Sequence, residues 1–377
     1  MEDNLLYWLW LQHALGPGST KPRKLLAHYG SARACYESGR ESWEQAGIFT
    51  PVERKRMADG TLEQAAAQLR LAQSLGQSVI CPDHPEFPVL LREIPSPPCV
   101  LYYKGTLPPA DALCIAMVGT RQATPDGLAA ADRLSYSLAK AGVVVVSGGA
   151  LGIDSACHRG ALRAGGKTLC ILGCGIDYNY LMKNAPLRET ISQNGALISE
   201  YPPNTPSSAH SFPIRNRLIS GLCAGTVVVE AAKKSGALIT VSAAIEQGRD
   251  VFAVPGAMVN EAARGANELI REGAKPVMSA QDILEEYPGC YWEETEQGSG
   301  RSVPAVPMEE AAPEPLELPG ALSANAAKLY QALGTSPRHI TEIALDAGLS
   351  VHHALAAVTE LELCGRARSF SGRRYSR

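Results

Sequence analysis

Glycine, hydroxyl and arginine residues follow two apolar segments in the middle of this chain of 377 residues. Gly119-Thr120-Arg121 comes directly after residues 113–118. Ser147 is the last residue of the segment 143–147, and Gly148-Gly149 follows it. A glycine turn that leads into a helix presents backbone N–H groups to an anion, and arginine can pair with a phosphate through two parallel hydrogen bonds. These residue types predict a site for a phosphate-bearing ligand. For the glycine turn, a tight connection that binds nothing is the alternative.

Further candidates follow later apolar segments. The residues proposed to contact phosphates or bases there are Lys183, Asn184, Phe212, Arg215, Asn216, Arg217, Gly265 and Asn267. Arg215 and Arg217 are two positions apart on a predicted helix, so they cannot share a face. We expect one to line the groove, and the other to brace the fold or to meet Glu200. Phe212 is a candidate stacking platform, as are Tyr178 and Tyr180, and its alternative role is a hydrophobic staple at a helix start.

Several of these groups also have plain structural roles open to them. Arg121 has the alternative of an internal ion pair with Asp154 or Asp177. Asp154 is expected to serve the first turn of its helix, and His158 to be a hydrogen-bonded core residue. The chain has neither the G-x-G-x-x-G fingerprint nor a P-loop, and its cysteines lack metal-ligand spacing. We therefore expect no cofactor and no metal.

Composition limits the class of protein. The formal net charge is −3, so a polyanion site must be local. Ten cysteines are scattered without a C-x-x-C pair, and many lie in apolar strands, which is typical of reduced core thiols. The chain begins with acidic residues where a signal peptide needs bases, and no apolar run approaches a membrane span. We expect a cytoplasmic protein without a membrane segment.

Strands and helices alternate from residue 113 to about 288. The predicted strands are 113–118, 143–147, 168–172, 196–199, 225–229 and 250–254, with helices between them such as 126–141. This alternation predicts an α/β fold, an extended Rossmann-like doubly wound parallel sheet. Such sheets bind ligands outside the carboxyl ends of their strands. The motifs are therefore expected along one rim.

The predicted domains are a helical N-terminal domain (1–76), the Rossmann-like domain (77–288), an acidic proline-rich linker (289–320) and a C-terminal domain (321–377). The Rossmann-like domain begins with an irregular proline-rich lead-in, 77–112, that contains a strand over 100–104. In the first domain, Gly16-Pro17-Gly18 followed by Lys21, Arg23 and Lys24 resembles half of a helix-hairpin-helix motif. A helical bundle that packs on a neighbour is the favoured interpretation of that domain.

The last predicted domain has the pattern of a winged helix. Helices over 322–333, 339–346 and 351–363 precede a basic tail with five arginines, and Ser350 is placed to cap the third helix. In a DNA-binding winged helix, the third helix and the wing contact the duplex. Because this third helix has no Lys or Arg, a protein-contact role is favoured, and the arginine tail keeps DNA binding open.

Together the motifs resemble the DNA-processing protein A (DprA/Smf) family. The matching segments, in family order, are Gly119–Arg121, Ser147–Asp154, Gly173–Asn184, Phe212–Arg217, Ser235–Thr240 and Gly248–Gly256. One departure is Tyr180-Leu181-Met182-Lys183-Asn184, where the family usually has Tyr-Pro-x-x-Asn with a lysine after the proline. The resemblance implies a homodimeric, non-catalytic protein that binds single-stranded DNA. It also implies that the protein loads the RecA recombinase on this DNA during natural transformation.

Two other functions stay open at this point. A lysine-decarboxylase-like phosphoribohydrolase would use the same rim for a nucleoside monophosphate, with Glu200 or Glu230 assisting N-glycosidic cleavage. That family has a Pro-Gly-Gly-x-Gly-Thr turn before its glutamate, and this sequence lacks the turn. The other possibility is an adaptor whose terminal domains are docking surfaces.

Overall fold

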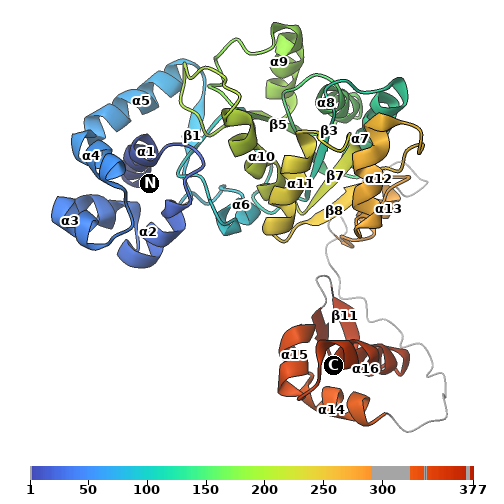
Figure 1. Ribbon diagram of the computed structural model, residues 1–377. Helices are drawn as coiled ribbons and strands as arrows, with labels where there is room; N and C mark the ends of the chain where they lie inside the picture. Colours follow the sequence, from blue (N-terminus) through green and yellow to red (C-terminus); the bar gives the residue numbers. More distant parts are fainter. Residues whose placement is uncertain (1, 290–322, 335, 337, 371–373) are drawn as a thin grey trace. The chain divides into compact units, whose positions relative to one another are not determined.

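The computed structural model describes residues 2–289, 323–334, 336, 338–370 and 374–377. The chain divides into two compact units, Met1–Ser302 and Val303–Arg377 (Figure 1). Apart from Gly289, the predicted acidic linker over 289–320 lies outside the described residues. The domain boundaries at residues 76, 288 and 320 stay predictions.

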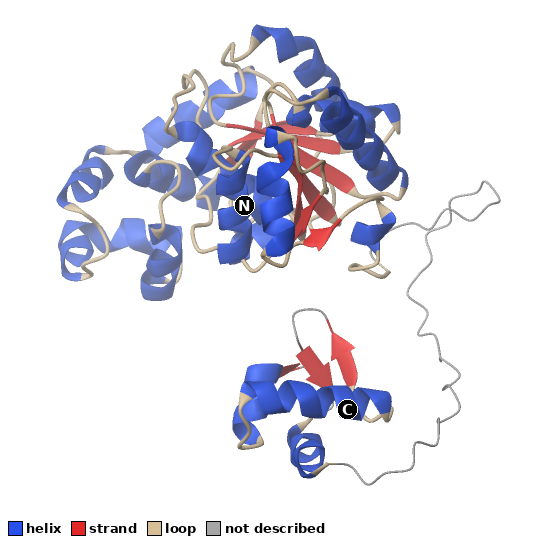
Figure 2. Ribbon diagram, turned by 45° about the vertical axis from the view of Figure 1, so that its right-hand side comes forward, coloured by secondary structure: helices blue, strands red, loops and turns tan. Residues whose placement is uncertain are grey.

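A nine-stranded sheet forms the centre of the first unit, with helices on both sides (Figure 2). The strands are β1 (Ser78–Ile80), β2 (Leu101–Gly105), β3 (Cys114–Gly119), β4 (Val144–Gly148), β5 (Thr168–Leu172), β6 (Ala196–Ser199), β7 (Gly225–Glu230), β8 (Asp250–Ala253) and β9 (Lys275–Pro276). Their spatial order is β1-β2-β6-β5-β4-β3-β7-β8-β9. Neighbouring strands in the series β6-β5-β4-β3-β7-β8-β9 are parallel. Strand β2 pairs antiparallel with both β1 and β6.

Helices cover both faces because the strands are apolar on both. Ile115 and Met117 of β3 pack with one set of helices, and Ala116 and Val118 pack with the other. The first set includes α7 (Pro125–Lys140), α8 (Ile153–Arg163) and α13 (Gln281–Leu284). The second includes α6 (Val89–Glu93), α10 (Ser211–Gly221), α11 (Ala237–Glu246) and α12 (Arg264–Arg271). The other helical elements between residues 113 and 288 are α9 (Ala185–Asn194) and two short 3-10 helices, η1 (Met182–Asn184) and η2 (Glu261–Ala263).

The predicted fold class is confirmed, with one correction. Each strand predicted between residues 113 and 254 is present, and the helix predicted over 126–141 is α7. The lead-in over 77–112 is less irregular than expected, because it contains β1 and α6 as well as the predicted strand, now β2. The three residues of β1 have too short a pattern to identify alone, and pairing with β2 makes them a strand. Among the described residues, no helix combines the length and apolar character that a membrane crossing requires.

The helices predicted within residues 1–76 are present and share a core with the sheet. They are α1 (Glu2–Leu15), α2 (Lys21–Tyr29), α3 (Ala32–Gln45), α4 (Pro51–Asp59) and α5 (Leu62–Ser74). Trp8, Trp10 and Trp43 belong to the same buried cluster as Tyr102 of β2 and Leu197 of β6. The N-terminal helices are therefore held against the sheet by shared apolar burial.

The second unit is a winged helix, as predicted. Its elements are α14 (Ala324–Ala332), β10 (Arg338–His339), α15 (Ile340–Asp346), α16 (Val351–Leu363), β11 (Arg368–Phe370) and β12 (Arg374–Ser376). The strands form an antiparallel sheet in the order β10-β12-β11, and Leu329, Ile343 and Leu361 lie in one buried cluster. The Ser350 side chain accepts a hydrogen bond from the His353 N–H, so it caps α16 as expected.

Candidate nucleic-acid interface

A cleft of about 620 Å³ opens at the carboxyl ends of β3 and β7. These strands are neighbours at the point where the winding reverses, since the chain runs from β3 through β4, β5 and β6 on one side and continues with β7 on the other. Doubly wound sheets bind their ligands at such a switch point. The lining comes from the loop after β3, the turn after β4, the first part of α10 and the start of α11.

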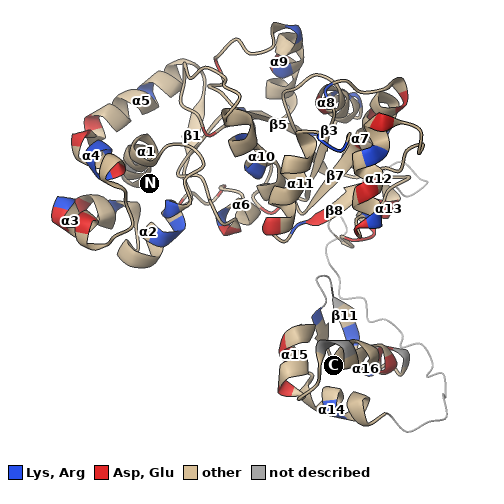
Figure 3. Ribbon diagram, viewed as in Figure 1, with Lys and Arg blue, Asp and Glu red and all other residues tan. Residues whose placement is uncertain are grey.

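Arg121 lies exposed on the loop after β3. The loop is anchored by Thr120, whose N–H donates to the Glu230 carbonyl over 2.7 Å. Within the part of the chain that the structure describes, no ion pair includes Arg121, so the alternative of a pair with Asp154 or Asp177 is not observed. Figure 3 shows Lys and Arg segments on α10 and next to β3. The Arg121 guanidinium is thus available to a phosphate.

Phe212, half-buried at the start of α10, is the aromatic centre of the cleft. Its ring centroid lies 5.4 Å from that of Tyr180, at an interplanar angle of 44°. The guanidinium carbons of Arg121 and Arg215 lie 5.4 and 5.9 Å from the Phe212 centroid. An aromatic ring beside two cations suits a stacked base with its phosphate close by. Neither Tyr180 nor Tyr178, the other two stacking candidates, lines the cleft.

The two arginines of α10 divide their roles, as the spacing predicted. Arg215 lines the cleft at 5% exposure; its Nη1 donates to the Ile171 carbonyl and its Nε to Asn216 Oδ1 over 3.2 Å. Arg217 meets Glu200 instead, with Nη2 2.7 and 2.8 Å from the two carboxylate oxygens. Asn216 also lines the cleft, and its Nδ2 lies 3.4 Å from the Gly236 carbonyl before α11.

The glycine turn after β4 packs beneath the cleft rather than at its surface. Ser147, Gly148 and Gly149 are buried, and Ser147 Oγ donates to the Met117 carbonyl over 2.6 Å. A Cβ at Gly148 would lie 2.4 Å from Arg215 Nη1 and 2.6 Å from Asp154 Oδ2. Glycine is needed here so that these two side chains can lie against the backbone. From this turn, Ala150 lines the cleft and the three predicted residues do not.

Two titratable groups belong to this region: Asp154 lines the cleft, and His158 is buried beside Gly148. Burial raises the pKa of the Asp154 carboxyl, while the positive charges of Arg215 and Arg121 act to lower it. Asp154 Oδ2 accepts from the Ala150 N–H over 3.3 Å, at the turn that begins α8. His158 is a core residue, as expected, with Nδ1 2.7 Å from Thr168 Oγ1 and Nε2 2.9 Å from the Gly148 carbonyl. Burial lowers the pKa of His158 to about 4, so the ring is neutral near pH 7.

The loop that departs from the family pattern does not reach the cleft. Asn184 is buried, and its Nδ2 donates to the carbonyls of Gly149 and Ala150 and to Ser155 Oγ, over 2.9 to 3.3 Å. It therefore holds the turn after β4. Lys183 is exposed and lies outside the cleft lining. Leu181 has a φ of 48°, which proline cannot adopt, so the departure also changes the local backbone.

Gly265 and Asn267 of α12 hold neighbouring loops. The Gly265 N–H donates to the Ala231 carbonyl over 2.7 Å, and a Cβ at Gly265 would lie 2.6 Å from that oxygen. The Asn267 side chain accepts from the Gly256 N–H and donates to its carbonyl, over 3.1 and 2.9 Å. Neither residue lines the cleft.

The structure therefore brings together part of the predicted set. The predicted residues that line the cleft are Gly119, Thr120, Arg121, Phe212, Arg215 and Asn216. The site predictions missed other residues that line it, among them Gln122, Asp154, Ser235, Gly236, Ile239 and Thr240. The available signal was position, because Ser235 to Thr240 follow β7, the neighbour of β3 across the switch point.

Neither glutamate of the hydrolase alternative lines the cleft. Glu230 accepts hydrogen bonds from the Thr124 N–H and Oγ1 over 2.8 and 2.7 Å, at the start of α7. Glu200 pairs with Arg217, as described above. Both carboxylates therefore have structural partners within the fold.

Comparisons with known proteins cover both units. The sequence pattern of the DNA recombination-mediator protein A family matches residues 78–288, and that of the DprA winged helix domain matches 309–373. The Smf protein of Synechocystis is 34% identical over 329 residues, which are 81% of each chain. The DNA processing protein DprA of Streptococcus pneumoniae is 42% identical over 201 residues, 53% of this chain and 71% of that protein.

Solved structures of two relatives also resemble this chain. The X-ray structure of DprA from Streptococcus pneumoniae has a TM-score of 0.64 at 32% identity, and the match covers 74% of this chain and 95% of that one. The structure of DprA from Helicobacter pylori, solved for its single-stranded DNA binding mode, has a TM-score of 0.51 at 30% identity. That match covers 57% of this chain and 97% of the other.

Proposed function

This chain belongs to the DNA processing protein A (DprA/Smf) family, and on that basis we propose that it binds single-stranded DNA in the cleft at the carboxyl ends of β3 and β7. The observation that carries the proposal is Arg121, an exposed guanidinium beside the Phe212 ring at the switch point of the sheet. The Helicobacter pylori relative, described for its single-stranded DNA binding mode, supports the choice of ligand.

The chemistry of the cleft favours a single strand over a duplex. Arg121 pairs with a phosphate, while a neighbouring base stacks on Phe212. A base in a duplex has its faces covered by its neighbours, so it reaches an aromatic ring only if it leaves the stack. The recessed Arg215 adds positive charge and holds Phe212 and Asn216 in place.

The full role that we propose is that of a recombination mediator. The chain loads the RecA recombinase on single-stranded DNA during natural transformation, acts as a homodimer in the cytoplasm, and catalyses no reaction itself. The family description as a DNA recombination mediator supports this role. The cysteines among the described residues are all free, which suits a reducing compartment.

Fluorescence anisotropy with labelled oligo-dT tests the proposal, with the matching duplex and a salt series run in parallel. We expect tight binding that prefers the single strand and weakens steeply with salt, since several phosphates are neutralised. Arg121→Glu is expected to weaken binding by about 100-fold without lowering the melting temperature, because the side chain is exposed. Arg159→Glu, an equal charge change at an exposed position of α8 outside the cleft lining, is the control.

Absence of binding to any oligonucleotide would overturn the proposal. Equal losses of oligo-dT affinity for Arg121→Glu and Arg159→Glu would show that binding depends on overall charge and not on the cleft. A large drop in melting temperature for Arg121→Glu would make that residue structural. RecA loading is checked separately, by RecA filament formation on coated single strands with and without this protein.

A further inference from the structure

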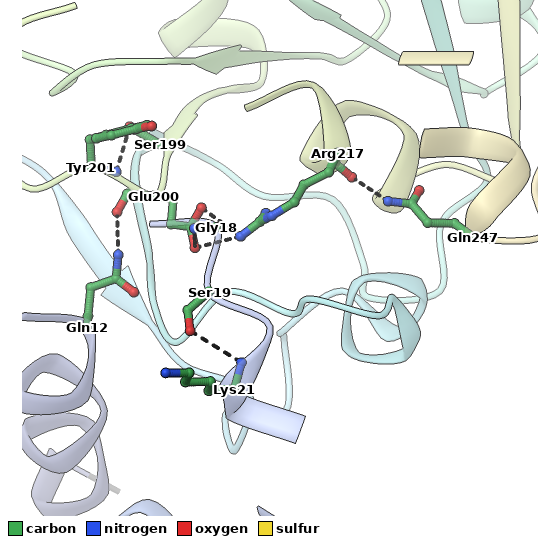
Figure 4. A network of polar contacts seen from close by, with 9 residues as sticks. All are labelled: Gln12, Gly18, Ser19, Lys21, Ser199, Glu200, Tyr201, Arg217 and Gln247. Atoms are coloured by element: carbon green, nitrogen blue, oxygen red, sulfur yellow. Dashed lines mark hydrogen bonds and ion pairs between the residues drawn. The ribbon is translucent and has the colours of Figure 1, made fainter. Parts of the chain in front are cut away.

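The N-terminal helices meet α10 at one buried carboxylate, that of Glu200, which follows β6 (Figure 4). The Glu200 side chain is 2% exposed, and Arg217 of α10, at 11%, contacts both carboxylate oxygens. From the N-terminal side, the Gly18 N–H donates to Glu200 Oε1 over 3.2 Å. Gln12 Nε2 donates to the Glu200 carbonyl over 3.0 Å. We call these four residues the Glu200 junction.

Gly18 also lies directly against α10. Its φ is 79°, and a Cβ at this position would lie 2.7 Å from Cγ2 of Ile214. Ile214 stands between Phe212 and Arg215, two residues that line the cleft. Any displacement of the Gly16–Gly18 turn towards α10 would therefore push the helix that carries the cleft residues.

The turn that resembles half of a helix-hairpin-helix motif thus serves an internal anion. The Gly18 N–H that would face a DNA phosphate faces the Glu200 carboxylate, and Lys21 pairs with Glu53. Among the described residues, Nε and Nη1 of Arg217 have no hydrogen-bond partner. The position of Arg217 therefore depends on Glu200, and through it on the turn.

We propose that the Glu200 junction positions the DNA cleft. Glu200 and the Gly16–Gly18 turn hold α10 in the position from which Phe212, Arg215 and Asn216 contact the single-stranded DNA. The N-terminal helices then influence the affinity of a cleft to which they contribute no lining residue. Glu200, Arg217 and Gly18 are positioning residues, because none of them lines the cleft. This inference rests on the proposed binding of single-stranded DNA.

Two alanine substitutions at matched glycines test the junction. Gly18 and Gly30 both belong to the N-terminal region and have φ values of 79° and 77°, so alanine carries a similar backbone penalty at each. A Cβ at Gly30 meets nothing within 4 Å, whereas at Gly18 it meets Ile214. We expect Gly18→Ala to weaken oligo-dT binding by about tenfold, and Gly30→Ala by less than about twofold.

Hydrogen exchange separates positioning from a general loss of stability. Amides of α10 are expected to exchange faster in Gly18→Ala but not in Gly30→Ala. In the unmodified protein, saturating oligo-dT is expected to slow exchange of the Gly18 amide, since coupling between two sites is reciprocal. This last measurement needs no variant, so it decides the matter even if Gly18→Ala fails to fold.

Two results would overturn the positioning role: equal affinities for the two alanine variants, or exchange at Gly18 that oligo-dT leaves unchanged. Arg121→Glu serves as the reference for binding in the cleft. If the unmodified protein binds oligo-dT and Arg121→Glu does not, the proposed function stands and only the positioning role fails. If the unmodified protein binds no DNA, the proposed function fails first.

Discussion

The cleft and the Glu200 junction receive arginines from the same helix, two positions apart. Arg215 lines the cleft, and the exposed Arg121 stands opposite with no ion pair among the described residues. At the junction, the Arg217 side chain is 11% exposed and forms an ion pair with Glu200. Residue type therefore does not tell which arginine serves a ligand. The difference lies in whether the fold brings a carboxylate to the guanidinium before a phosphate can reach it.

Burial makes the two regions respond differently to substitution. An arginine exposed at a cleft is solvated, so it can be replaced with little effect on folding. A buried ion pair has lost its hydration, and removal of one partner leaves the other charged and poorly solvated. Substitutions in the cleft should thus change the affinity for DNA, and substitutions at the junction should also change the stability of the fold.

The largest effect is expected at the junction. Glu200→Gln should lower the free energy of unfolding by about 4 kcal/mol, because Arg217 stays charged and buried without its partner. Asp132→Asn breaks an exposed ion pair, in which the side chain of Asp132 is 35% exposed and that of Arg163 is 57% exposed. This substitution should lower the free energy of unfolding by less than about 1 kcal/mol. Urea unfolding monitored by circular dichroism measures both. Similar costs would contradict the contrast between a buried and an exposed pair.

His158, beneath the cleft, predicts a pH dependence. Burial lowers its pKa to about 4, from 6.5 for an ordinary histidine. Between these values the unfolded chain binds more protons than the folded one, so the free energy of unfolding falls as the pH falls. The histidine should account for a loss of about 3 kcal/mol between pH 7 and pH 4. Urea unfolding of His158→Gln should show a correspondingly flatter profile, and an unchanged profile would show that His158 is not the group responsible.

Phe212→Ala tests the stacking platform. Loss of one base–aromatic contact should weaken oligo-dT binding by about tenfold. Tyr178→Ala is the matched control, because Tyr178 is 38% exposed and lies outside the cleft lining. Anisotropy titrations give both affinities. If Tyr178→Ala loses as much affinity as Phe212→Ala, the single-stranded DNA does not bind by stacking on Phe212 in the cleft.

The smallest effect is expected from removal of residues 303–377. The first unit contains the whole cleft and its own buried clusters, so the affinity for oligo-dT should stay within about threefold. The same anisotropy assay measures it. Complete loss would move the site, or an essential dimer contact, to the winged helix.

Much of the fold could be read from the sequence because its signals are local. Runs such as Val143–Val146 are apolar on both faces, which predicts buried parallel strands, and alternation with helical spacing predicts their winding. The carboxyl ends of those strands share a rim, so Arg121, Phe212 and Arg215 could be proposed together. Pairing between distant segments left no such signal, and β1 was missed for that reason.

The tertiary structure decided which of the candidate residues are available to a ligand. Asn184, Asn267 and Gly148 have the chemistry of a phosphate site, yet the first two bond to neighbouring loops and the third lies beneath Arg215. Arg217 is likewise taken by Glu200. The order of residues along the chain establishes the strands, the rim and the kinds of groups on it. Whether a polar group faces solvent or a buried partner depends on contacts between segments far apart in sequence, and only the folded chain forms them.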